Sequence, residues 1–257
     1  MIRIPIVSLF LTGTLFLVPL HSARSQAVDV LDLPVRSSPA WKSIALSDAL
    51  GQLGSYVQDG FILFGLEENL QDGKEPRVDF EAKSGTTLRR VLRDILAQLP
   101  PYEMEVVSSH LVDLRPAGAK GNTKNPLNLR VPDFDVISRP VYGILGAPRR
   151  VIPELDEVLT PKAEPGKQAI TLYFGGADGG PRVTLHLKNV SVREILNAAS
   201  VASEPFFAYH DRTRAPAGWV YCFNPNPSPG NSGHSWKWNF TMPADWMKPG
   251  TENRGHP

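Results

Sequence analysis

The chain has 257 residues, carries 27 basic and 26 acidic side chains, and contains one cysteine, Cys222. A charge balance so close to zero gives no electrostatic footprint for nucleic acid or an anionic membrane surface. A single cysteine excludes an intramolecular disulfide, so the fold must depend on hydrophobic cores. Cys222 lies between two aromatic residues in a predicted strand, and we expect a small buried apolar residue there rather than a nucleophile.

Residues 1–27 have the pattern of a secretory signal. Arg3 provides a short positive region, an apolar run follows from Ile4 to Leu20, and small residues at Ser25 and Ala27 suit a signal peptidase. The alternative is an uncleaved anchor, but prolines interrupt the run and leave it short for a membrane span. We expect export to the periplasm, with secretion as the alternative. No later run approaches the ~20 apolar residues of a spanning helix, so no span is expected after cleavage.

Residues 28–40 are predicted to be an extended lead-in, because Pro34 and Pro39 disfavour a helix. Residues 41–116 then predict the order strand, helix, strand, strand, helix, strand, strand. The expected elements are a strand from Ile44, a helix capped by Ser47 or Asp48 that ends near Gly60, strands over Phe61–Leu66 and Val78–Ala82, a helix over Leu88–Leu99 stopped by Pro100, and a hairpin over Tyr102–Arg115.

Three patterns in this region resemble the short N-terminal domain shared by secretins and TonB-dependent signal transducers. They are the capped helix Leu46-Ser-Asp-Ala-Leu-Gly-Gln-Leu53, the strand Val78-Asp-Phe-Glu-Ala82 running into Thr87-Leu-Arg-Arg-Val-Leu-Arg-Asp-Ile-Leu96, and the closing strand Tyr102-Glu-Met-Glu-Val106. The resemblance implies two helices held between two small sheets. It also implies a role in protein contacts within the bacterial envelope, and no invariant chemistry. Secretins and TonB-dependent receptors carry the domain ahead of a channel, whereas this chain has no such channel.

Residues 117–126 are Gly-rich and polar and are predicted to be a flexible linker. Residues 127–223 are predicted to be a divergent second copy, since the strand and helix from Arg182 to Ser200 repeat the pattern from Arg77 to Leu92. Pro148 and Pro153 break the region of the first helix, which departs from the family pattern. The expected elements are a strand over Leu127–Val136, short helices around Val141–Leu145 and Ile152–Leu159, strands over Ala169–Phe174 and Val183–Leu187, a helix from Val192 with Ser191 and Glu194 as a capping box, and strands over Phe206–Tyr209 and Gly218–Phe223.

Residues 224–257 form a distinct tail, in which a Pro- and Gly-rich link precedes a predicted strand over Ser235–Phe240. This strand could pair with residues 218–223 as a hairpin or dock elsewhere on the second domain. Trp236, Trp238 and Phe240 would share one of its faces. Such a stripe could be a stacking platform for sugar rings or for apolar groups of a partner, or it could pack on the protein's own sheet.

Candidate chemistry is sparse elsewhere. The histidines beyond residue 27 have no metal-ligand spacing, and the Gly-rich stretch at Asp178 precedes a strand rather than the helix that a phosphate loop requires. The pairs Asp133 and Asp135, and Glu103 and Glu105, could be drawn as catalytic carboxylates, but acids that alternate on a strand are usually solvated. We therefore predict no catalytic residue, no cofactor and no metal.

The sequence thus predicts an α+β protein of two small tandem domains, each with two helices packed against small mixed sheets. The first functional hypothesis is a non-enzymatic, exported module that binds an envelope protein, possible partners being an outer-membrane channel or a transducer component. The second is a glycan-binding protein or hydrolase that uses the aromatic tail. The third is a structural role based on self-association through sheet edges.

Overall fold

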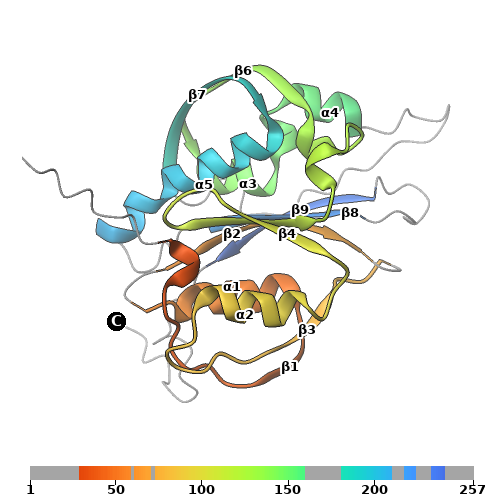
Figure 1. The fold of residues 1–257 in the computed structure, drawn as a ribbon. Helices are drawn as coiled ribbons and strands as arrows, with labels where there is room; N and C mark the ends of the chain where they lie inside the picture. The colour runs from red at the N-terminus through yellow and green to blue at the C-terminus, as the bar shows by residue number, and fades with distance from the viewer. Residues whose placement is uncertain are drawn as a thin grey trace, which may run out of the picture.

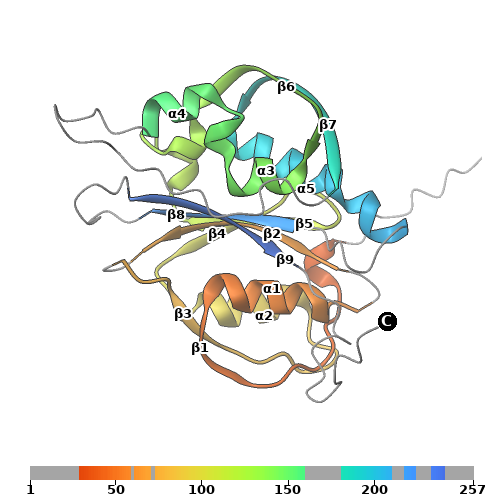
Figure 2. The ribbon, with the colours of Figure 1, turned by 180° about the vertical axis from the view of Figure 1, so that it is seen from behind.

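The computed structural model describes residues 29–58, 61–70, 73–159, 181–209, 217–223 and 233–240. The predicted signal, the strand over Ala169–Phe174, the turn at Asp178 and the end of the tail lie outside these residues. The described chain stacks in five layers, with a central sheet between two helical layers and a two-stranded ribbon beyond each (Figure 1). The same layers are seen from behind in Figure 2. The predicted α+β class is confirmed.

The first half follows the predicted element order. Its elements are β1 (Trp41–Ala45), α1 (Leu46–Tyr56), β2 (Leu63–Asn69), β3 (Arg77–Phe80), α2 (Leu88–Leu96), β4 (Tyr102–Val106) and β5 (Leu111–Pro116). Helix α1 begins at Leu46 without a side-chain cap, so the predicted caps are wrong. Helix α2 begins where Thr87 accepts a hydrogen bond from the Arg90 N–H. The lead-in, predicted as extended, contains a short 3₁₀ turn over Val30–Asp32.

The second half carries β6 (Arg130–Pro140), α3 (Val141–Gly146), α4 (Pro153–Leu159), β7 (Arg182–Ser191), α5 (Val192–Tyr209), β8 (Ala217–Phe223) and β9 (His234–Phe240). The predicted strand over Phe206–Tyr209 is wrong. Helix α5 continues through these residues, because its buried positions recur at helical spacing as far as Ser203 and keep the backbone helical past Pro205. The predicted capping box is confirmed, since the Ser191 N–H donates to the Glu194 carboxylate at 2.6 Å.

The segment 117–126, predicted as a flexible linker, is folded. It contains the 3₁₀ turn η2 (Ala119–Gly121) and leads into η3 (Pro126–Asn128). Asn125 is buried, and its side chain accepts from the Leu127 N–H and donates to Glu67. The side chain of Asn128 donates to the carbonyl groups of Ala119 and Asn122. These amide contacts hold the segment in place, which the Gly-rich composition alone does not reveal.

The central sheet is built from both halves in the order β4-β5-β2-β8-β9. Strand β2 is parallel to β5 on one side and to β8 on the other. Strands β8 and β9 form the hairpin that was one of the two alternatives for the tail. The junction is tight, because a Cβ on Gly218 would lie 2.1 Å from the Phe64 carbonyl oxygen, and one on Gly65 would lie 2.7 Å from the Trp219 ring. The two halves are therefore joined edge to edge through main-chain hydrogen bonds.

Each face of this sheet covers a separate apolar core. Helices α1 and α2 pack on one face against residues such as Leu66, Leu114 and Val220. Helices α3 and α5 pack on the other face, where Trp219 and Tyr221 are the largest buried side chains. Because side chains alternate along a strand, each strand of the central sheet contributes to both faces.

The outer ribbons, β1 with β3 and β6 with β7, share one irregularity. Each contains a serine with positive φ, Ser43 in β1 and Ser138 in β6, both at +51°. In each ribbon the serine N–H donates to a side chain of the facing strand, and an arginine of that strand donates to the serine carbonyl. The equivalent partners are Asp79 and Arg77 in the first half and Thr184 and Arg182 in the second. The same local geometry occurs in the two halves, and the partner residues on β3 and β7 occupy equivalent positions of the sequence repeat.

Candidate functional site

A network of buried charges lies on the central sheet where α5 crosses it. The Arg193 guanidinium contacts Glu67 of β2 at 2.5 Å and Asp113 of β5 at 3.2 Å. Arg115, also in β5, binds Asp113 at 3.2 Å. All four of these residues are buried, and the second carboxylate oxygen of Glu67 accepts from Asn125 at 2.8 Å. The network thus joins polar side chains of β2 and β5, together with Asn125, to the first turn of α5.

Burial dominates the electrostatics of this network. It raises the pKa of Asp113, although Arg193 and Arg115 act in the opposite direction. Every carboxylate in the network has a cationic or amide partner within hydrogen-bond distance. Carboxylates held in this way form buried ion pairs, and these pairs join the two halves.

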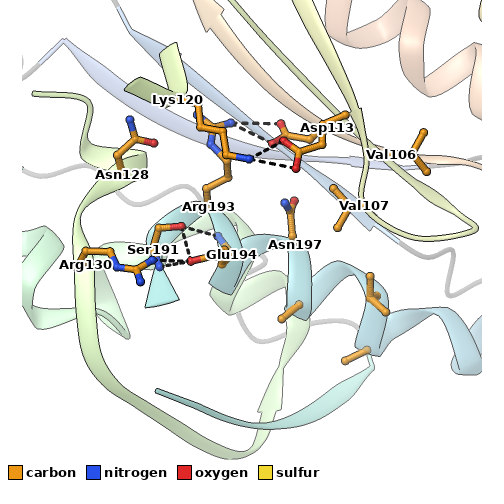
Figure 3. Close-up of a pocket in the computed structure, with 14 residues that line it drawn as sticks. Val106, Val107, Asp113, Lys120, Asn128, Arg130, Ser191, Arg193, Glu194 and Asn197 are labelled. Carbon is orange, nitrogen blue, oxygen red and sulfur yellow. Dashed lines mark hydrogen bonds and ion pairs between the residues drawn. The ribbon is translucent and has the colours of Figure 1, made fainter. Parts of the chain in front are cut away.

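A groove of about 750 Å³ opens beside this network, between the β4–β5 hairpin and α5. Figure 3 shows its polar end, where Arg130, Ser191 and Glu194 interact and Lys120 lies across from them. Val106 and Val107 lie at the other end, with Asn197 between them and Arg193. Small apolar side chains of α5 complete the lining: Ala198, Val201 and Ala202. The volume is in the range of ligand sites, and the mixed lining suits an extended peptide.

Strand β4 borders this groove and forms an edge of the sheet within the described residues. The Val107 N–H donates to the Leu111 carbonyl, and the Ala117 N–H donates to the Pro101 carbonyl. These two bonds show that the odd-numbered residues of β4 are the ones that hydrogen-bond to β5. Main-chain groups of Tyr102, Met104 and Val106 must therefore point away from β5. Met104 and Val106 also expose 36% and 42% of their surface. The edge combines main-chain groups directed outward with exposed apolar side chains.

Of the two carboxylate pairs considered from the sequence, Glu103, Glu105 and Asp135 form ion pairs. Glu105 contacts Arg115 and Lys120, both at 2.9 Å, and Glu103 lies 3.4 Å from Arg115. On β6, Asp135 contacts His186 at 2.8 Å on an exposed face. None of these contacts has the geometry of an acid and base facing a common cleft.

The predicted aromatic stripe is described in part. Trp236 of β9 packs on Tyr221 with ring centroids 4.5 Å apart, and belongs to the border of the second core. This position favours packing on the protein's own sheet for Trp236. Trp238 lies opposite Trp219 and Phe240 opposite Ala217 in the hairpin, and their side chains lie outside the described residues.

A second cavity, of about 630 Å³, was not foreseen from the sequence. It lies between the folded segment 117–126, the end of α4 and the β8–β9 hairpin. Phe223 and His234 stack there at 5.0 Å, and the Tyr221 hydroxyl lies 2.6 Å from Nδ1 of His234. Burial lowers the pKa of His234. Asn69, Asn122 and Lys124 line the polar side of the cavity.

Two further clusters could suggest chemistry. Ser109 and Glu204 both approach Nδ1 of His110, at 3.0 and 3.4 Å, whereas a catalytic triad needs the serine and the acid on opposite ring nitrogens. Ligand atoms of Glu68, Glu75 and Cys222 lie within 4.8 Å of one another. Cys222 is buried as predicted, and its thiol donates to Glu68 at 3.3 Å. Three ligands fall short of the four of a structural zinc site.

Within the described residues, no helix has the length and apolar character needed to cross a membrane. Comparison with models of protein families, with curated proteins and with solved structures finds no match. The geometry of the groove and of the β4 edge is therefore the direct evidence on which a function can be proposed.

Proposed function

We propose that this protein is an exported, non-enzymatic module that binds another protein of the bacterial envelope through the β4 edge and the adjoining groove. The observation that carries the proposal is the outward-facing backbone of Tyr102, Met104 and Val106 beside a cavity of peptide-binding size. An extended segment can add to such an edge, because the main-chain hydrogen bonds supply affinity and neighbouring pockets supply specificity.

The groove supports this proposal through its position. Its lining includes Val106 and Val107 from the β4 end and Val201 and Ala202 from α5, so side chains of an added strand would enter it directly. Natural proteins usually protect exposed edges with charges, prolines or bulges. Strand β4 carries Glu103 and Glu105, but both are held on the groove side by Arg115 and Lys120, and the backbone edge stays open in the described structure.

Site-specific photocrosslinking in intact cells tests the proposal. A photoreactive amino acid at position 104 should yield one dominant crosslinked envelope protein, whereas the same group at Ile137, which is 75% exposed on β6, should not. Met104→Pro removes the outward N–H of β4 without deleting a β4–β5 hydrogen bond and should abolish stable association with that protein, while Met104→Ala keeps the N–H and should retain it. Equal crosslinking from both positions, or association that survives Met104→Pro, would contradict the proposal.

The second cavity supports a different candidate, a glycan-binding protein. Its aromatic wall of Phe223 and His234 faces amide side chains, a combination that suits the apolar face and the hydroxyls of a sugar ring. Titration with an N-acetylglucosamine tetramer, followed by calorimetry, tests this candidate. Binding that is lost in Phe223→Ala and retained in Met104→Ala would favour it, and no heat change at millimolar sugar would exclude it.

A further inference from the structure

We infer that the β4 edge accepts a strand that runs parallel to β4, supplied by another protein, with basic and apolar side chains alternating along it. The inference rests on the proposed function, since it assumes that β4 is the contact surface. It adds the direction and the chemistry of the bound strand. Both follow from comparing β4 with β8 and from the charges beside β4.

Strand β8 is the equivalent of β4 in the second half of the chain, and it shows which strand direction such an edge accepts. Strands β4 and β8 occupy equivalent places, because each follows the last α-helix of its half and pairs antiparallel with the next strand. The other edge of β8 is taken by β2 in parallel register, with Gly65 opposite Trp219 and Asn69 opposite Phe223. The equivalent edge of β4 has no neighbour within the described residues. In β8, the edge equivalent to the free edge of β4 is therefore already paired with a parallel strand.

The two faces of β4 define the side chains of the added strand. On the groove side, Glu103 and Glu105 expose 45% and 41% of their side chains. Together with Asp113 and Glu67, they set four carboxylates against the three cations Arg115, Lys120 and Arg193. A lysine or arginine beside these glutamates would balance the surplus negative charge. Met104 is exposed on the opposite face, and Val106 is exposed where the strand reaches the end of the groove, so apolar neighbours suit both.

The same charges disfavour a second copy of β4 as the partner. Two β4 strands in antiparallel register would bring Glu103 of one copy opposite Glu105 of the other, and neighbouring like charges destabilise a strand pair. In parallel register through the same edge, the glutamates of one copy would lie on the Met104 face of the other, beside apolar side chains instead of cations. Strand β2, the parallel partner of β8, is already flanked on both sides in this chain. The complementary strand therefore belongs to a different protein.

The test uses two synthetic nine-residue peptides with the purified full-length protein. One alternates valine with lysine and the other alternates valine with glutamate. Amide resonances of β4 should shift on addition of the lysine peptide, and its Kd should be about tenfold lower than that of the glutamate peptide, as expected for two or three complementary cross-strand pairs. A nitroxide at the peptide's N-terminus should broaden the Tyr102 amide, and one at the C-terminus should broaden the Val106 amide.

The outcomes separate this inference from the proposed function. The reverse pattern of broadening, or equal affinity of the two peptides, would overturn the inference and leave docking at β4 intact. If neither peptide binds but Met104→Pro still abolishes partner association, the inference would be overturned and docking at β4 would stand. Partner association that survives Met104→Pro would overturn both. Sedimentation showing a dimer that Met104→Pro dissociates would assign the edge to a second copy and overturn the choice of partner.

Discussion

The two halves of the molecule share their local geometry and differ in what they place on the central sheet. The first half directs Glu67, Asp113 and Arg115 toward α5, whereas the second half directs Trp219 and Tyr221 to the same face. One sheet face is thus charged under its first three strands and aromatic under β8. A sheet face that carries paired charges can face either water or a helix, whereas a face that carries tryptophan must be buried under another element. The difference shows that Arg193 of the second half is what allows the charged face of the first half to be buried.

Removing Arg193 should have the largest effect on the stability of the protein. Arg193→Met leaves Glu67 and Asp113 buried with one cation fewer, and we expect a loss of about 3–5 kcal/mol in the free energy of unfolding. Urea unfolding measures it. Arg130→Met, which removes an exposed ion pair with Glu194 on the same side of the molecule, is the control and should cost under about 1 kcal/mol. Equal effects of the two variants would show that the buried network does not hold the halves together.

The junction of β2 and β8 should be the next most sensitive. Gly218→Ala places a methyl group 2.1 Å from the Phe64 carbonyl oxygen, so one strand must move, and we expect a loss of about 1–3 kcal/mol. The matched control is Gly121→Ala, whose added Cβ meets nothing within 4 Å. Thermal unfolding should show a lower Tm for Gly218→Ala alone. An unchanged Tm would mean that the two halves do not share a continuous sheet.

The two ribbons allow a symmetric test. Ser43 and Ser138 both have φ of +51°, a conformation that costs an L-residue roughly 1 kcal/mol and costs glycine little. Ser43→Gly and Ser138→Gly should each raise the free energy of unfolding by up to about 1 kcal/mol, measured by urea titration. Similar gains in stability for both variants would support the structural equivalence of the two halves. Stabilisation of one variant and destabilisation of the other would show that the irregularity has a different structural role in each ribbon.

The smallest effect concerns pH and belongs to the second half alone. Burial lowers the pKa of His234 below its ordinary value of 6.5, so the unfolded chain binds this proton more readily than the folded one. Stability should therefore fall as the pH is lowered through 6.5 toward the folded pKa. His234→Gln should reduce the slope of Tm against pH between 7.5 and 5.5. A slope that is the same in both proteins would assign the pH dependence to other groups.

The sequence predicted the elements whose apolar residues have a clear period. Helix α2, the capping box at Ser191 and the β8–β9 strands were all expected from alternation, helical spacing or capping patterns. The error at Phe206–Tyr209 came from four apolar and aromatic residues whose local preference for a strand was overruled, because α5 continues to Tyr209. Short runs of this kind do not distinguish a strand from the end of a helix.

The groove and the charge network could not be predicted in the same way. Glu67, Asp113 and Arg193 are far apart in the chain, and each lies in a pattern that is also typical of a solvated surface. They meet only because β2 lies between β5 and β8, and no local pattern specifies that pairing. One signal was present, since consecutive acids at Glu67 and Glu68 interrupt an apolar strand, but it identified a polar position without its partner.

The parallel pairing of β2 with β8 has a consequence for the order of folding. The contact between Cys222 and Glu68 spans 154 residues, so the sheet cannot close until nearly the whole chain is present. During synthesis from the N-terminus, the β2 edge stays unpaired until the second half has been made. Non-local pairings of this kind form slowly. During that interval the two edges of the three-stranded sheet, β2 and β4, are unpaired together, and a chaperone that binds extended segments would find a site on either side.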